Sequence, residues 1–95
     1  MEMIFFPPKY KKSLLLGKKN MTIRHGNEIG KYKVGRIYHA VSYSEKIDFG
    51  LNVKIINVLL LKINELSNFN IPKLTIKKLE KETSGPVEII KFIVV

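Results

Sequence analysis

Cysteine is missing altogether from this chain of 95 residues. Disulfides, zinc–thiolate sites, iron–sulfur clusters and thiol nucleophiles are therefore excluded. Histidine occurs only as His25 and His39, and neither lies at helical or hairpin ligand spacing from a carboxylate or from the other histidine. The sequence thus predicts no metal site and no other cofactor.

Long hydrophobic runs are missing as well. Apolar stretches such as Val58–Leu61 are far shorter than the ~20 residues that a membrane-spanning helix needs. The first residues, with Glu2 and the pair Pro7 and Pro8, do not form the charged, apolar and small-residue regions of a secretory signal. We therefore expect a cytoplasmic protein without a membrane partner.

Acidic residues are scarce, and the net charge is +9. Residues 1–36 carry nine Lys or Arg against two Glu, a net charge of +7, and no acidic residue lies between Met3 and Asn27. Such one-sided charge favours an anionic partner, with nucleic acid first and an acidic membrane surface second. The alternative is that the lysines only keep the protein soluble.

The length suits one domain, 1–95, with a single core. Alternation and turn residues predict strands at 3–6, 21–26, 35–43 and 87–95. Helices are predicted at 9–16, where Gly17 suits the left-handed C′ position, and from Pro72 to about Glu82. We expect turns at 44–50 and a loop at 67–72.

The segment 51–63 is apolar on every side in its middle. Its β-branched residues, Val53, Ile55, Ile56 and Val58, favour a long central strand, although a helix in its second half stays open. The element order then predicts an α+β domain with a small, curled sheet of about five strands and two helices.

The stretch from Leu14 to about Val41 carries a pattern of spaced residues: Gly17, Lys19, Thr22, Arg24 and Gly35. In this pattern it resembles the signature of the ASCH domain, a branch of the PUA-like superfamily. The resemblance implies a small PUA-like, partly open β-barrel with a cleft beside the first helix, which takes RNA or nucleotide-like ligands. The ligand could be a polymer or a nucleoside.

The resemblance also implies an activity, because some small members of the family are 4-acetylcytidine amidohydrolases. Their roles would fall on Thr22 as nucleophile and Lys19 as base, with Arg24 lining the cleft. The family's glutamate would fall near Phe69, and the carboxylate closest to that place is Glu65. Without the resemblance, Thr22 is an ordinary strand threonine and Lys19 a cation at a helix end.

Further residues are candidates for ligand binding on chemical grounds. The planar fork of Arg24 suits a phosphate, and Lys9, Lys12 and Lys18 would form a rim that steers polyanions. Three aromatic residues could stack on a base, although we expect at least two of them to pack in the core; they are Tyr32, Tyr38 and Phe6.

The sequence therefore predicts an RNA- or nucleotide-binding domain with a basic cleft around Lys19, Thr22 and Arg24. One alternative is an amidohydrolase that deacylates 4-acetylcytidine-type nucleosides, with Glu65 completing the site. Others are a ribonuclease that depends on Lys19 or Arg24, and a docking module for an acidic protein. We expect a monomer or a weak dimer.

Overall fold

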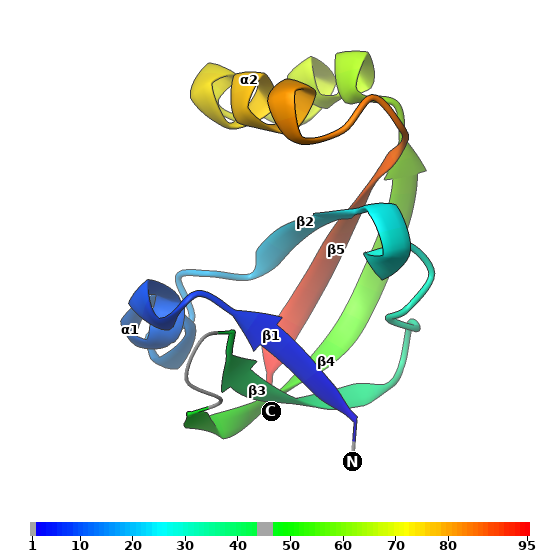
Figure 1. Ribbon diagram of the computed structural model, residues 1–95. Helices are drawn as coiled ribbons and strands as arrows, with labels where there is room; N and C mark the ends of the chain where they lie inside the picture. The colour runs from blue at the N-terminus through cyan, green and yellow to red at the C-terminus, as the bar shows by residue number, and fades with distance from the viewer. Residues whose placement is uncertain (1, 44–46) are drawn as a thin grey trace.

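The protein is described by a computed structural model that covers residues 2–43 and 47–95. Five strands, two α-helices and three 3-10 segments follow one another in these residues (Figure 1). In chain order they are β1 (Met3–Phe6), η1 (Pro8–Tyr10), α1 (Lys11–Leu15), β2 (Met21–His25), η2 (Gly26–Glu28), β3 (Ile37–Ser42), β4 (Asp48–Leu61), η3 (Ile63–Phe69), α2 (Lys73–Glu82) and β5 (Val87–Val94).

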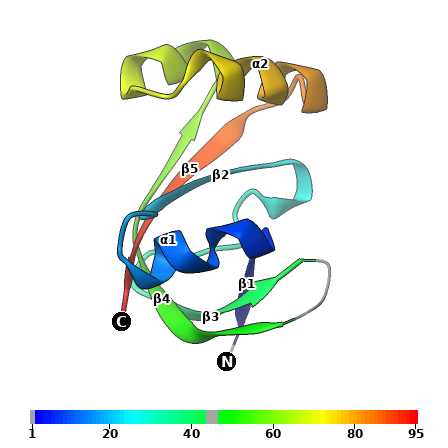
Figure 2. The same cartoon turned by 90° about the vertical axis from the view of Figure 1, so that its left-hand side faces the viewer.

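All five strands belong to one sheet in the order β1-β3-β4-β5-β2, in which only β1 and β3 pair in parallel. Register shifts between His39 and Val41, and between Ile55 and Asn57, interrupt the pairing of β4 with its two neighbours. Such bulges increase the local twist of a sheet. The sheet curls into the partly open barrel of the α+β prediction, as Figures 1 and 2 show.

The curled sheet has two hydrophobic clusters, one for each helix. The larger includes Leu14 of α1 together with residues of β1, β3, β4 and β5. The smaller lies under α2, where Leu79 packs with Ile71, Val87 and Ile89. Figure 2 shows α2 and η3 at one end of the sheet and α1 beside β1. The helices thus cover different parts of the same sheet.

Most predicted elements are present, with changes at their ends. The first helix is split into η1 and a short α1, and Gly17 has the expected left-handed backbone, with φ of 71°. Segment 51–63 is strand up to Leu61, because its second half pairs with β5, and β4 begins at Asp48 rather than after the predicted turn. Residues 44–46 of that turn lie outside the described residues.

The predicted loop at 67–72 is partly wrong, because η3 extends through Phe69. In that segment Glu65 accepts a hydrogen bond from the Lys62 backbone N–H, as in a capping box. Asn70 then takes a left-handed conformation, with φ of 57°, before α2 begins. Within residues 2–43 and 47–95, no helix is long and apolar enough to cross a membrane.

Candidate functional site

The side chains of the sequence pattern meet at one face of β2. Thr22 and Arg24 are 9% and 5% exposed, and Met21, Ile23 and His25 between them are half-buried. This alternation follows from the two-residue period of a strand. The prediction that Thr22 and Arg24 point to the same side is therefore confirmed.

A turn between α1 and β2 delivers Lys19 to the same place. Gly17 ends α1, and the backbone N–H groups of Lys18 and Lys19 both donate to the Ser13 carbonyl, at 2.8 and 3.1 Å. The Lys19 ammonium then donates to the Met21 carbonyl at 2.8 Å and lies 4.3 Å from the centroid of the Tyr10 ring. These contacts fix both the backbone and the charged end of Lys19.

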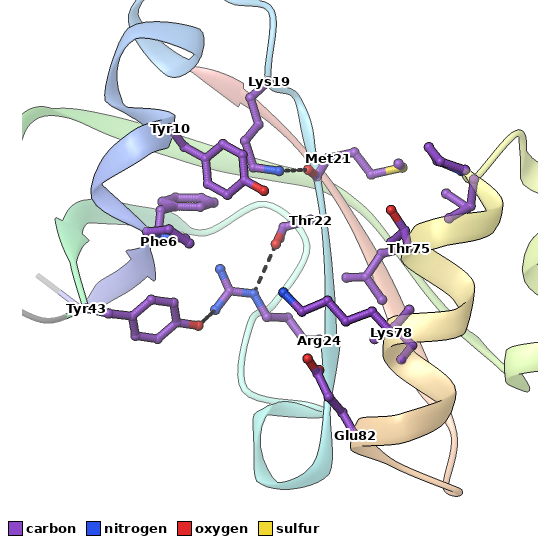
Figure 3. Close-up of a pocket in the computed structure, with 15 residues that line it drawn as sticks. Phe6, Tyr10, Lys19, Met21, Thr22, Arg24, Tyr43, Thr75, Lys78 and Glu82 are labelled. Carbon is purple, nitrogen blue, oxygen red and sulfur yellow. Dashed lines mark hydrogen bonds between the residues drawn. The ribbon is translucent and has the colours of Figure 1, made fainter.

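A cleft with a volume of about 350 Å³ opens between β2 and α2. Figure 3 shows Lys19, Thr22 and Arg24 on the β2 side and Thr75, Lys78 and Glu82 on α2. Phe6, Tyr10 and Tyr43 line the remaining wall. The volume lies in the range of small-molecule sites, about 300–1,000 Å³.

Arg24 gives its donors to protein partners. Its Nε donates to Thr22 Oγ1 at 3.2 Å, Nη1 to the Tyr43 hydroxyl at 3.0 Å, and Nη2 to the Phe5 carbonyl at 2.7 Å. Glu28 lies 3.6 Å from Nη1. A bidentate phosphate contact would have to displace these partners. Arg24 is therefore first a buried cross-link between β2, β1 and Tyr43, rather than the open fork that the sequence suggested.

This cross-link changes the chemistry of Thr22. Because Oγ1 accepts a hydrogen bond from a cation, negative charge on that oxygen would be stabilised, and the hydroxyl proton stays available for another acceptor. Burial, together with the positive charges of Arg24 and Lys9, lowers the pKa of Lys19 below its ordinary value of 10.5. A lysine with a lowered pKa carries a neutral, basic amine more often than an exposed lysine does.

The carboxylate of the cleft is Glu82, not Glu65. Glu82 belongs to the last turn of α2, lines the cleft and contacts His25 Nε2 at 3.0 Å. Glu65 is absent from the cleft lining, and its carboxylate caps η3 instead. The structure therefore corrects the choice of Glu65: the acid that shares a cleft with Lys19 and Thr22 comes from a segment later in the chain.

Tyr32 lies in the core, which is a second correction. Its side chain is 1% exposed and packs edge to face against Tyr38, so it offers no face to a base. Burial raises the pKa of Tyr32 to about 12, and its hydroxyl has no hydrogen-bond partner in the described part of the chain. Tyr38 and Phe6 are also 1% exposed, in line with the expectation that at least two of these rings pack in the core.

The rim lysines lie at different distances from the cleft. Lys9 lies 5.3 Å from the centroid of the Tyr10 ring, and Lys18 lines a smaller hollow beside the cleft. Lys12 is exposed on α1 and lines neither space. Within residues 2–43 and 47–95, no three metal-ligating side chains (His, Cys, Asp or Glu) gather at one place.

No protein-family model and no curated protein matches the sequence. Solved structures with the same arrangement come from Zymomonas mobilis. The crystal structure of ASCH from this organism aligns with 95% of this chain at a TM-score of 0.69 and 12% identity. A tyrosine-to-phenylalanine and a serine-to-alanine variant of ZmASCH align with 96% and 95% of it at TM-scores of 0.71 and 0.70, each at 12% identity. This chain has the ASCH-domain fold.

The aligned region makes up 64–67% of those longer chains, so this chain spans about two thirds of the ASCH proteins that it matches. At 12% identity the likeness covers the fold alone. What the ASCH fold contributes here is the placement of β2 opposite α2, and hence the cleft. The chemistry of the cleft has to be argued from its own side chains.

Sequence reasoning missed the whole α2 wall. Thr75, Lys78 and Glu82 follow one another at spacings of three and four, which places them on one helix face. That spacing was a usable signal for a polar stripe beside the apolar stripe of Ile76 and Leu79. Nothing in the local sequence indicated that this stripe faces β2.

Proposed function

We propose that this chain binds RNA or a nucleotide in the cleft between β2 and α2. The observation that carries the proposal is the pair of lysines on the two sides of the cleft, Lys19 beside β2 and Lys78 on α2. Among the described residues, Lys78 has no carboxylate within ion-pair distance. Its ammonium is therefore available to an anionic ligand.

The walls also suit the rest of a nucleotide. Apolar and aromatic surface from Tyr10, Tyr43 and Pro72 can pack against a base or sugar, while Thr22 and Thr75 supply hydroxyl groups. Glu82 adds one acceptor for an N–H donor of the ligand. A cleft with both signs of charge fits a ligand that has an anionic part and a neutral polar part.

The test is equilibrium binding of single-stranded RNA and of the four nucleoside monophosphates at several salt concentrations. We expect RNA affinity to fall steeply with salt, and Lys78→Gln to weaken binding by about 5- to 10-fold while reducing the salt slope by roughly 0.7. Lys77→Gln is the matched control, because Lys77 is exposed on the same helix and does not line the cleft. Undetectable or salt-independent binding would refute the proposal.

A second candidate, an amidohydrolase acting on 4-acetylcytidine-type nucleosides, is favoured by the hydrogen bond from Arg24 to Thr22 Oγ1 and by the lowered pKa of Lys19. In this reaction Thr22 Oγ1 attacks the acyl carbon, its proton passes to neutral Lys19, and the amine leaves with a proton. Water then hydrolyses the threonine ester and releases the acid. Glu82, not Glu65, would be the acid of the site.

An assay on 4-acetylcytidine decides between binding alone and turnover. Thr22→Ala and Lys19→Ala should each abolish deacylation, and Glu82→Gln should lower it, while Glu65→Gln should leave it unchanged. Absence of turnover, or turnover that survives Thr22→Ala, would refute the amidohydrolase hypothesis. Gel analysis of the RNA from the binding assay covers the ribonuclease alternative, which requires cleavage that is lost with Lys19→Ala.

A further inference from the structure

A second hollow adjoins the cleft on the α1 side. It has a volume of about 270 Å³ and shares Tyr10, Lys19 and Met21 with the cleft. Its other lining residues are Ser13, Lys18 and Asn20. The two spaces are therefore neighbours, and Lys19 lies at the boundary between them.

The hollow is built on a fixed turn. The backbone N–H of Lys18 donates to the Ser13 carbonyl at 2.8 Å, and the Asn20 carbonyl accepts from the N–H of Phe92 in β5 at 2.9 Å. Gly17 supplies the left-handed residue that this turn requires. Because both ends of the turn are bonded, its backbone is fixed whether or not a ligand is present, and the Lys19 ammonium is held by the Met21 carbonyl, which lowers the entropic cost of binding.

The two spaces differ in charge. Glu82 lines the cleft, whereas among the described residues no carboxylate lines the hollow. The hollow presents the ammonium of Lys18, the hydroxyl of Ser13 and the amide of Asn20, all of which can donate hydrogen bonds. The Lys19 ammonium donates one of its three N–H groups to the Met21 carbonyl, so two N–H groups stay available to a ligand. The hollow is therefore a second place for an anionic group, one without a carboxylate beside it.

We propose that the hollow is a phosphodiester subsite, so that the ligand is a single-stranded oligonucleotide of at least two nucleotides. One nucleoside lies in the cleft, and the phosphate that joins it to the next lies between Lys19 and Lys18. The inference rests on the proposed nucleotide binding in the cleft and assigns the polymer, rather than the free nucleoside, as the preferred ligand. Ser13 and Asn20 contact phosphate or sugar oxygens, as such side chains do in nucleic-acid complexes.

The test uses dinucleoside monophosphates of mixed sequence and the same compounds with an uncharged methylphosphonate linkage. Binding is followed by NMR chemical-shift titration of the wild type, Lys18→Gln and Lys33→Gln. Lys33→Gln removes the same charge from a residue that lines neither space. The comparison is a double-mutant cycle between one lysine and one phosphate charge.

We expect the methylphosphonate to weaken binding to the wild type and to Lys33→Gln by about 5- to 10-fold, and to Lys18→Gln by only about 2- to 3-fold, because Lys19 still contacts the phosphate. An equal loss in all three proteins would overturn the subsite. If mononucleotides still bind in a Lys78-dependent way, the cleft proposal survives that result. If neither mononucleotides nor dinucleotides bind, both proposals fall.

Discussion

Replacing Arg24 with alanine should lower the free energy of unfolding, because Arg24 is primarily a structural cross-link. Three hydrogen bonds join this buried guanidinium to Thr22, to the Phe5 carbonyl and to the Tyr43 hydroxyl. Its guanidinium carbon also lies 5.4 Å from the centroid of the Phe6 ring. Arg24→Ala removes all of these contacts from a side chain that is only 5% exposed.

The magnitude follows from the burial of each partner. A hydrogen bond to a charged group contributes about 1.5–3 kcal/mol. Tyr43 is half-exposed, and its hydroxyl can bond to water after the substitution, so the loss of this bond contributes little to the change in the free energy of unfolding. The loss therefore comes mainly from the two bonds to Thr22 and to the Phe5 carbonyl, which together predict about 3–6 kcal/mol. For a domain of this size, each kcal/mol lowers Tm by roughly 4–8 °C.

Urea and thermal unfolding followed by circular dichroism measure this loss. Arg36→Ala is the matched control, because Arg36 is 64% exposed and forms one ion pair, with Glu2 at 3.2 Å, which contributes less than about 1 kcal/mol. If Arg24→Ala is no more destabilising than Arg36→Ala, the cross-link is not important and Arg24 is free to bind ligand. In that case the guanidinium would again be the best candidate for a phosphate fork.

Three further predictions concern other residues. Gly17→Ala should cost about 1 kcal/mol in urea unfolding because of its φ of 71°, whereas Gly85→Ala, where a Cβ meets only ordinary contacts, should not. Hydrogen bonds to Asn52 and to the Asp48 carboxylate raise the pKa of His39 above 6.5. NMR titration should detect this shift and find it smaller in Asn52→Ala. Protonated His39 should therefore stabilise the fold at low pH, and this contribution should be lost as the pH rises through the raised pKa. Because the pKa of Lys19 is lowered, its loss of a proton should weaken ligand binding at a pH below the 10.5 of an ordinary lysine, and Lys19→Arg should remove this pH dependence.

Local sequence was sufficient to predict the β2 half of the site. A two-residue alternation places Thr22 and Arg24 on one face, and a glycine after a short helix places Lys19 at the turn that precedes them. Each of these relations involves residues only a few positions apart. The same reasoning predicted the order of the strands and helices, because turn residues and apolar periodicity are also local signals.

Tyr32 was misassigned because an aromatic side chain near cations has the same sequence context in a core as in a binding surface. In the structure it packs against Tyr38 of β3 and lies beside Arg24, which reaches inward to its own partners. Whether such a ring faces ligand or core depends on how the sheet curls. That curl arises from register shifts in β3, β4 and β5, which no local pattern in this sequence marks.

The position of Glu82 in the cleft depends on a longer path through the chain, and only Glu65 was considered from the sequence. β4 is fourteen residues long, and η3 and Asn70 turn the chain before α2 begins. Only then does the packing of Leu79 against the sheet turn the face with Lys78 and Glu82 toward β2. A search for a carboxylate near the start of α2 could not succeed, because the acid of the cleft lies in the last turn of that helix.

The two halves of the site therefore differ in charge: the β2 half is purely cationic, and the α2 half is mixed. The segment between Met3 and Asn27, which has no acidic residue, supplies the cations of the turn and of β2, whereas α2 supplies both a cation, Lys78, and the carboxylate of Glu82. An anion in the cleft meets both signs of charge, but an anion in the hollow meets only donors from the acid-free segment. This asymmetry favours the hollow for a phosphodiester that has no other partner, and the cleft for a nucleoside whose base can use Glu82 and whose own phosphate can use Lys78.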